Sequence, residues 1–243
     1  MGKLTDKIAL ITGGNKGIGR GIALAFAAEG ATLVLVARGQ ADLDRTAADV
    51  RALGAEVLTI PADVTDEKQV DALFAQTVAR FGRLDILVNN AGAFDGGPLD
   101  ELSVEAWDKV IALNLRAPFL CTRAAFRTMK KQAGGRIINI GSISAQRVRP
   151  GSGPYSTSKH GLWGLTQVTA LEGREFGIAC GCLHPGNTMV ERRQSTGKIE
   201  DDEPMMSAAE LAQAAVCMAT LPPHVNMLEA IVLPVGQLYV GRG

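Results

Sequence analysis

The segment KIALITGGNKGIGRGIALAFA, residues 7–27, joins an apolar run to a helix-like stretch through a glycine-rich turn. Glycine permits such a turn and lets backbone N–H groups approach a phosphate where the helix begins. The spacing is not the literal G-x-G-x-x-G. It is not a phosphate loop either, because Arg20 follows Gly19 where that loop has lysine. The turn therefore indicates a nucleotide site, and a tight turn without a ligand is the alternative.

The pattern of this segment repeats along the rest of the chain. Short apolar runs alternate with longer segments of helical period, which is typical of βαβ units and a parallel sheet. The runs are apolar on both faces, as expected when helices cover both sides of a sheet. We predict strands at 7–12, 31–37, 55–62, 84–90, 135–142, 178–185 and 229–235. We predict helices near 17–29, 40–53, 66–81, 103–131, 154–176 and 207–220. The fold class is α/β: a Rossmann-like doubly wound parallel sheet of about seven strands, in a single domain over 1–243.

The composition excludes several classes of function. Of 243 residues, 25 are Lys or Arg and 25 are Asp or Glu, so no basic excess points to nucleic acid or a membrane surface. Apolar runs are of strand length, and the first residues show no secretory pattern. We interpret Cys121, Cys180, Cys182 and Cys217 as reduced thiols and expect no metal site. The expected location is the cytoplasm, with no membrane or nucleic-acid partner.

Two long polar loops follow predicted strands. Residues 142–154 follow the fifth strand and residues 186–206 follow the sixth, at the sheet edge where open α/β folds bind ligands. We expect the loop of about 186–206 to cover the substrate. Arg147 and Arg149 in the first loop would attract an anionic substrate, or are simply solvated.

The stretch PYSTSKHGL, residues 154–162, places Tyr155 and Lys159 four residues apart. On a helix these two side chains share a face. A phenol ordinarily ionises at about pH 10, and a neighbouring ammonium favours its ionised form. The pair therefore suits proton transfer near neutral pH, although by itself it is also a common helix-surface pattern. We interpret His160 and His184 as structural residues.

These features, taken in order, resemble the short-chain dehydrogenase/reductase family. The motif T-G-x-x-x-G-I-G occupies residues 12–19, NNAG occupies 89–92 and PGNT occupies 185–188. The single residues that the family places between the first and last of these motifs follow in the same order: Asp63, Asn114, Ser142, Tyr155 and Lys159. The resemblance spans residues 12–188 and is to the family at large.

The resemblance implies a catalytic set of Asn114, Ser142, Tyr155 and Lys159. Tyr155 would be the general acid in carbonyl reduction and the general base in alcohol oxidation. Lys159 would also hold the nicotinamide ribose, Ser142 would bind the substrate oxygen, and Asn114 would support a water-linked proton path. Substrate contacts are expected at Ser142, Ser144, Tyr155 and Met189.

The resemblance also implies a set of cofactor contacts. Ile18 would lie near the nicotinamide, Asp63 and Val64 near the adenine, and the backbone at Asn187 and Thr188 near the carboxamide. The cofactor-binding residues are expected to be Gly13, Asn15, Lys16, Gly17, Ile18, Gly19, Arg38, Asp63, Val64, Asn90, Ala91, Gly92, Tyr155, Lys159, Pro185, Gly186 and Thr188.

The end of the second predicted strand favours NADP over NAD. An acidic residue there would bind a ribose 2′-hydroxyl, whereas an arginine accommodates a 2′-phosphate. This strand ends with Ala37 and Arg38, and the glycine-rich turn adds Lys16. Two solvated surface cations are the alternative.

The predicted function is NADP-dependent hydride transfer between nicotinamide and a carbonyl or secondary alcohol. The alternatives are a 3-oxoacyl-carrier-protein reductase and a non-catalytic NADP-binding sensor or scaffold. The final segment, LPVGQLYVGRG, lacks the double glycine of many fatty-acid reductases of the family, which weakens the first alternative. By resemblance, and from the long Ala- and Leu-rich segments 103–131 and 154–176, we expect a homo-oligomer, with a tetramer before a dimer.

Overall fold

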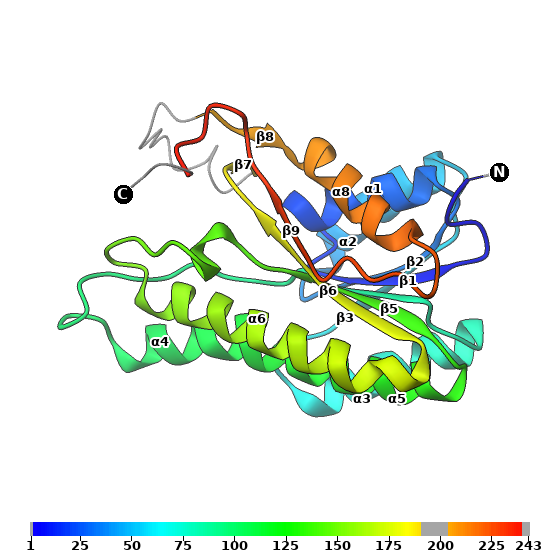
Figure 1. Cartoon of the computed structure of the whole chain (residues 1–243). Coiled ribbons are helices and arrows are strands. Elements are labelled where there is room, and N and C mark those ends of the chain that lie inside the picture. Colours follow the sequence, from blue (N-terminus) through cyan, green and yellow to red (C-terminus); the bar gives the residue numbers. More distant parts are fainter. Residues whose placement is uncertain (1, 191–203, 240–243) are drawn as a thin grey trace.

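Seven strands form one parallel sheet in the order β3-β2-β1-β4-β5-β6-β9 (Figure 1). The computed structural model describes residues 2–190 and 204–239. The strands are β1 Ile8–Thr12, β2 Thr32–Ala37, β3 Val57–Pro61, β4 Ile86–Asn89, β5 Gly135–Ile140, β6 Ile178–Pro185 and β9 Glu229–Val232. The strand order reverses between β1 and β4, so the carboxyl ends of these strands form a crevice suited to ligands. The predicted fold class is confirmed.

Helices cover both faces of this sheet (Figure 1). On one face lie α1 Gly17–Ala28, α2 Gln40–Ala52 and α8 Ala208–Thr220. On the other lie α3 Glu67–Phe81, α4 Val104–Ile111, α5 Ala117–Lys131 and α6 Gly153–Gly173, which a short 3₁₀ turn, Arg174–Phe176, extends. Among the described residues no helix is long and apolar enough to cross a membrane.

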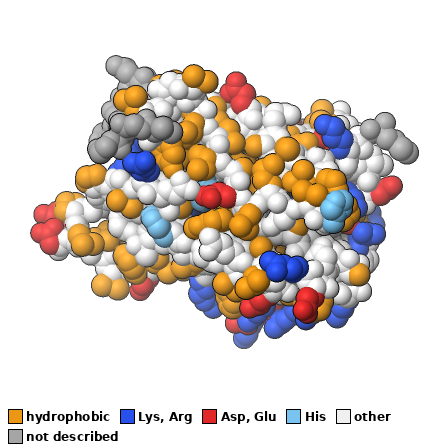
Figure 2. All heavy atoms as spheres, viewed as in Figure 1, with side chains coloured by type: hydrophobic (Ala, Val, Ile, Leu, Met, Phe, Trp, Pro, Cys, Tyr) orange, Lys and Arg blue, Asp and Glu red, His pale blue; other side chains and the backbone are white. Residues whose placement is uncertain are grey.

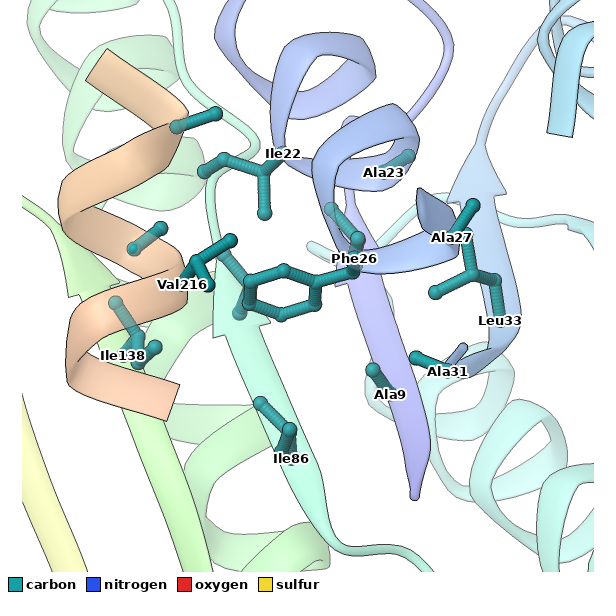
Figure 3. Close-up of a cluster of buried hydrophobic side chains, with 14 of the residues drawn as sticks. Ala9, Ile22, Ala23, Phe26, Ala27, Ala31, Leu33, Ile86, Ile138 and Val216 are labelled. Carbon is teal, nitrogen blue, oxygen red and sulfur yellow. The ribbon is translucent and has the colours of Figure 1, made fainter. Parts of the chain in front are cut away.

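Each face of the sheet has its own apolar core, as strand alternation requires. In β1, Ala9 and Ile11 point to the α1 side, while Ile8 and Leu10 point to the α3 and α5 side. Phe26 of α1 is fully buried and reaches toward β4 and α8 in the first core (Figure 3). Fully burying a side chain of this size contributes about 1.5–3 kcal/mol. This core sets the position of α1, and therefore of the glycine-rich turn before it.

Capping residues define several helix ends. The Asp66 side chain accepts hydrogen bonds from the N–H groups of Lys68 and Gln69 at the start of α3, and the helix ends at Gly82 in a left-handed conformation. At the start of α8, Ser207 and Glu210 form a reciprocal capping box.

One predicted helix, 103–131, contains an irregular turn. Between α4 and α5 the residues Ala112–Arg116 form a π-helical turn, closed by a bond from Ala117 N–H to the Ala112 carbonyl. The cause is Pro118, because proline has no N–H to donate to the carbonyl four residues earlier, that of Asn114. The wider turn occurs where the predicted catalytic asparagine stands.

The predicted substrate loop begins and ends in a short parallel pairing. Strand β7, Thr188–Met189, pairs with β8, Met206–Ser207, and Met206 N–H donates to the Asn187 carbonyl at 3.0 Å. Residues 191–203 of this predicted loop lie outside the described residues. The single-domain assignment stays a prediction.

Candidate active site

The glycine-rich turn is held to the end of β4 by a compact hydrogen-bond network. Thr12 Oγ1 accepts from the N–H groups of Asn90 at 3.0 Å and Ala91 at 3.1 Å. Asn90 Nδ2 in turn donates to the carbonyls of Thr12 at 2.9 Å and Gly13 at 3.1 Å. The NNAG segment thus positions the turn, and two predicted cofactor residues, Asn90 and Gly13, become neighbours although they are 77 positions apart in the sequence.

Close approach explains the glycine at 19. A Cβ there would lie 2.2 Å from the Gly13 carbonyl oxygen, so the turn packs against the first residues of α1 only without a side chain. Lys16, the N-cap, provides no side-chain cap, and the first turn of α1 holds no acidic residue. The positive end of this helix therefore suits an anion such as a pyrophosphate, and the residues present fit a dinucleotide.

The end of β2 carries the charges that bear on cofactor choice. Arg38 and Lys16 are both exposed. A carboxylate that the sequence analysis overlooked lies close by: Asp42, in the first turn of α2, accepts from Asn15 Nδ2 at 3.4 Å and pairs with Arg45. Asp42 stands three residues after Gly39, the N-cap of α2, and this position so soon after the second strand was the signal in the sequence that could have identified it.

Asp63 and Val64 follow β3, beside the end of β2 in the sheet. Asp63 Oδ1 accepts from Thr65 N–H at 2.9 Å and from Thr65 Oγ1 at 2.7 Å, while Val64 is buried. The Asp63 carboxylate therefore stabilises the turn Asp63–Thr65 that follows β3.

Tyr155 and Lys159 lie on one face of α6, as their spacing predicts. Lys159 is buried, and its Nζ donates to the Ile140 carbonyl at 2.7 Å, the last residue of β5. The same Nζ lies 5.7 Å from the centroid of the Tyr155 ring. An ammonium has three donors, so Lys159 retains N–H groups for the hydroxyls of a bound ribose.

Phe94 is a site residue that the sequence analysis missed. Its ring centroid lies 5.2 Å from that of Tyr155 at an interplanar angle of 57°, and the side chain is 49% exposed. It follows the NNAG segment by two residues, which was the signal that could have identified it. Phe94 presents an apolar surface beside the phenol.

Asn114 is buried and connects two segments of the site. Its Oδ1 accepts from Ala93 N–H at 2.8 Å, and its Nδ2 donates to the Ala93 carbonyl at 2.8 Å and to Ser158 Oγ at 3.2 Å. Both polar atoms of the Asn114 side chain therefore already make hydrogen bonds within the protein. Pro118 has no N–H to donate to the Asn114 carbonyl. The part of Asn114 in a proton path stays a prediction.

Ser142 follows β5 and caps the 3₁₀ turn Ile143–Ala145. Its Oγ accepts from Ser144 N–H at 3.1 Å, which leaves its own proton for a ligand. The backbone of Ser142 contacts His184 of β6, whose Nδ1 lies 2.8 Å from the Ser142 oxygen and 3.3 Å from its nitrogen. Burial lowers the pKa of His184 below its ordinary value of 6.5, and the ring is neutral at pH 7.

The segment after β6 is organised by a residue near the end of the chain. Gln237 Oε1 accepts from Asn187 N–H at 2.8 Å, and a Cβ at Gly186 would lie 2.2 Å from this same oxygen. Pro185 and Thr188 are buried, and Thr188 Oγ1 donates to the Gly186 carbonyl at 3.1 Å. Gln237 is a third residue that the sequence analysis missed, and nothing in the local sequence signals it.

Met189 points toward α1. With Gly17 and Arg20 it lines a cavity of about 300 Å³ between α1 and α8. The role of Met189 as a substrate contact stays a prediction. The described part of the chain contains no group of three His, Cys, Asp or Glu side chains that could hold a metal ion.

Comparisons with known proteins agree with this architecture. A family model described as short chain dehydrogenase matches residues 7–201. The chain is 36% identical to the 3-oxoacyl-[acyl-carrier-protein] reductase of Synechocystis sp., over 88% of this chain and 85% of that one. It is also 36% identical to the levodione reductase of Leifsonia aquatica, over 96% and 94%. A crystal structure of levodione reductase superposes with a TM-score of 0.87 at 32% identity, over 94% of this chain and 96% of that one.

The chain belongs to the short-chain dehydrogenase/reductase family. It is therefore an oxidoreductase of a family that uses a nicotinamide cofactor, NAD or NADP.

Proposed function

We propose that this protein is an NADP-dependent reductase of carbonyl compounds, or the reverse dehydrogenase of secondary alcohols. The observation that carries the proposal is the position of Lys159, whose buried Nζ lies beside the Tyr155 ring and bonds to the end of β5. A protein that only binds a cofactor needs no proton donor of this kind. The sensor or scaffold alternative is therefore disfavoured.

The residues of this chain supply binding, orientation and a proton. The Tyr155 phenol gives its proton to the substrate oxygen in reduction and takes it back in oxidation. The Lys159 ammonium stabilises the phenolate that remains, and the Ser142 hydroxyl donates to the same substrate oxygen. When bound, the nicotinamide supplies the hydride.

The preference for NADP is supported by charge at the end of β2. Arg38 and Lys16 are exposed cations, and a nearby carboxylate, Asp42, is paired with Arg45. Arginine presents a fork of donors that suits a phosphate. A 2′-phosphate would therefore find positive charge there.

The walls around the reacting groups bear on the substrate class. Phe94 provides an apolar wall, and Ser144 and the exposed Arg147 lie on the loop after β5. The likeness to a 3-oxoacyl-[acyl-carrier-protein] reductase favours that activity as a second candidate. A panel of aldehydes and ketones that includes levodione and a 3-oxoacyl thioester distinguishes the two.

The test of the mechanism is Tyr155→Phe, which removes only the hydroxyl. We expect turnover to fall by a factor on the order of 10²–10⁴, the usual contribution of a positioned acid or base. Binding of NADPH, followed by its fluorescence, stays near that of the wild type. Near-normal turnover in this variant would refute the catalytic role of Tyr155.

We further propose a cytoplasmic homotetramer. Exposed apolar side chains, including Phe119 on α5 and Val168 and Leu171 on α6, remain uncovered in the single chain. Apolar side chains are spread widely over the face shown in Figure 2, and charged side chains gather toward its lower edge. Such surface favours contact between copies. Light scattering that gives a monomer mass at micromolar concentration would refute assembly.

A further inference from the structure

His184 occupies a space that only a glycine at 141 leaves open. A Cβ at Gly141 would lie 2.5 Å from His184 Nδ1 and 2.7 Å from Cys182 Sγ. The imidazole is fully buried and packs edge-on against Trp163 of α6, with ring centroids 5.9 Å apart. The ring is therefore fixed directly beside the backbone of Ser142.

The two ring nitrogens of His184 have different surroundings. Nδ1 is 2.8 Å from the Ser142 carbonyl oxygen and 3.3 Å from the Ser142 nitrogen. Nε2 lies 3.4 Å from Glu229 Oε1 and makes no hydrogen bond within the described part of the chain. The Ser142 N–H donates to Nδ1 only when Nδ1 is unprotonated, whereas the contact with the Ser142 carbonyl requires a proton on Nδ1. The two contacts therefore belong to opposite tautomers, and the shorter one favours Nδ1–H.

A neutral imidazole has one proton for two acceptors, the Ser142 carbonyl and the Glu229 carboxylate. Burial and the positive charge of Lys159 disfavour the protonated, charged form of the His184 ring, whereas the hydrogen bond with Ser142 and the charge of Glu229 favour it. Among the described residues, Lys159, Glu229 and Cys182 are titratable groups near the ring. Glu229 Oε1 already accepts from Gln146 Nε2, whose own Oε1 accepts from the Tyr239 hydroxyl. Glu229 is thus partly satisfied without His184.

We propose that His184 is a positioning residue for Ser142: its Nδ1–H binds the Ser142 carbonyl and holds the serine hydroxyl in place for the substrate oxygen. The proposal rests on the proposed function of Ser142. Through Glu229 and Gln146, the same contacts join Ser142 to the loop after β5 and to Tyr239 near the end of the chain. His184 itself exchanges no proton with the substrate.

A matched pair of substitutions tests the hydrogen bond. In His184→Asn the amide nitrogen takes the position of Nδ1 and can still donate to the Ser142 carbonyl. His184→Leu has nearly the same shape but no donor, and both variants lose the same packing against Trp163. We expect kcat with His184→Leu to be about tenfold lower than with His184→Asn, the effect of one lost hydrogen bond. The dissociation constant of NADPH should be equal in both.

The protonation of the ring is tested without substrate. Imidazole ¹⁵N shifts distinguish Nδ1–H from Nε2–H, and the His184 signals are assigned by their loss in either variant, since the chain has 3 histidines. We expect Nδ1 to be protonated and Nε2 not. An Nε2–H tautomer or an imidazolium at neutral pH would overturn the proposal.

Failure of this proposal is distinguishable from failure of the proposed function. Normal turnover in Ser142→Ala would refute the role of Ser142 and the positioning proposal that rests on it, while the reductase function itself is tested by Tyr155→Phe. Turnover lost in Ser142→Ala but equal in the Asn and Leu variants would overturn the positioning role alone.

Discussion

Lys159 joins α6 to the sheet: its Nζ donates a 2.7 Å hydrogen bond to the carbonyl oxygen of Ile140, two residues before Ser142. The bond fixes the ammonium between the strand that presents the serine and the helix that presents the tyrosine. The same charge is thereby held 5.7 Å from the centroid of the Tyr155 ring.

Lys159→Met should therefore cause two separate defects. The dissociation constant of NADPH should rise about tenfold to a hundredfold, the usual effect of losing hydrogen bonds from a charged group. Turnover should also fall, because the phenolate that forms in carbonyl reduction loses the neighbouring ammonium. Fluorescence titration and steady-state kinetics at saturating NADPH measure the two effects. Normal turnover at saturating cofactor would contradict the electrostatic role of the lysine.

Cofactor selectivity should respond in opposite directions at two positions. Arg38→Asp should weaken NADPH binding about tenfold to a hundredfold and improve NADH binding relative to it, because the phosphate loses its cation and meets a carboxylate. Asp42→Asn should strengthen NADPH binding by a smaller factor, since it removes a negative charge beside the glycine-rich turn. Dissociation constants of both cofactors test this, and equal wild-type affinity for NADH and NADPH would show the phosphate argument to be wrong.

Pro118→Ala should separate stability from activity. Alanine restores an N–H that can bond to the Asn114 carbonyl, so the π-helical turn Ala112–Arg116 can close toward a regular helix. We expect an unfolding temperature at or above that of the wild type, together with lower turnover as Asn114 shifts. The check is thermal unfolding beside steady-state kinetics. A more stable variant with full activity would show that the turn has no part in catalysis.

The stability of the protein should fall in mild acid because of His184. Burial lowers the pKa of His184 in the folded state below the ordinary 6.5, so the unfolded chain takes up this proton first. The contribution is complete above the unfolded pKa and is lost as pH falls from about 6.5 through the lower pKa of the folded state, with a slope of at most about 1.4 kcal/mol per pH unit. Chemical denaturation between about pH 5 and pH 7.5 measures it. His184→Asn should have a shallower slope, and an identical slope would assign the effect to other groups.

Thiol labelling should separate one cysteine from the other three. Cys121, Cys180 and Cys182 are buried, and burial raises the pKa of Cys121 and of Cys182 to about 12, so these thiols stay protonated at neutral pH. Cys217 is exposed. A thiol reagent should label Cys217 rapidly in the native protein and the other three only after unfolding. The Cys217→Ser variant is the control, and rapid labelling of that variant would contradict the buried assignment.

The sequence by itself determined the elements and their order. Apolar periodicity of strands and helices located each strand of the sheet, and the turn from Thr12 to Gly19 indicated where a dinucleotide binds. These signals are local, because glycine conformations, helix periods and the four-residue spacing of Tyr155 and Lys159 depend on neighbours in the chain. The family also followed from motifs read in order.

Only the tertiary structure decided which side chains meet across these elements. The contacts of Asn90 with Gly13, of His184 with Ser142 and of Gln237 with Asn187 join residues 77, 42 and 50 positions apart. No local pattern encodes such pairs, because they depend on the register of parallel strands and on which space a glycine leaves open. For the same reason Phe94, Asp42 and Gln237 were recognised as site residues only once the sheet had placed them beside the motifs.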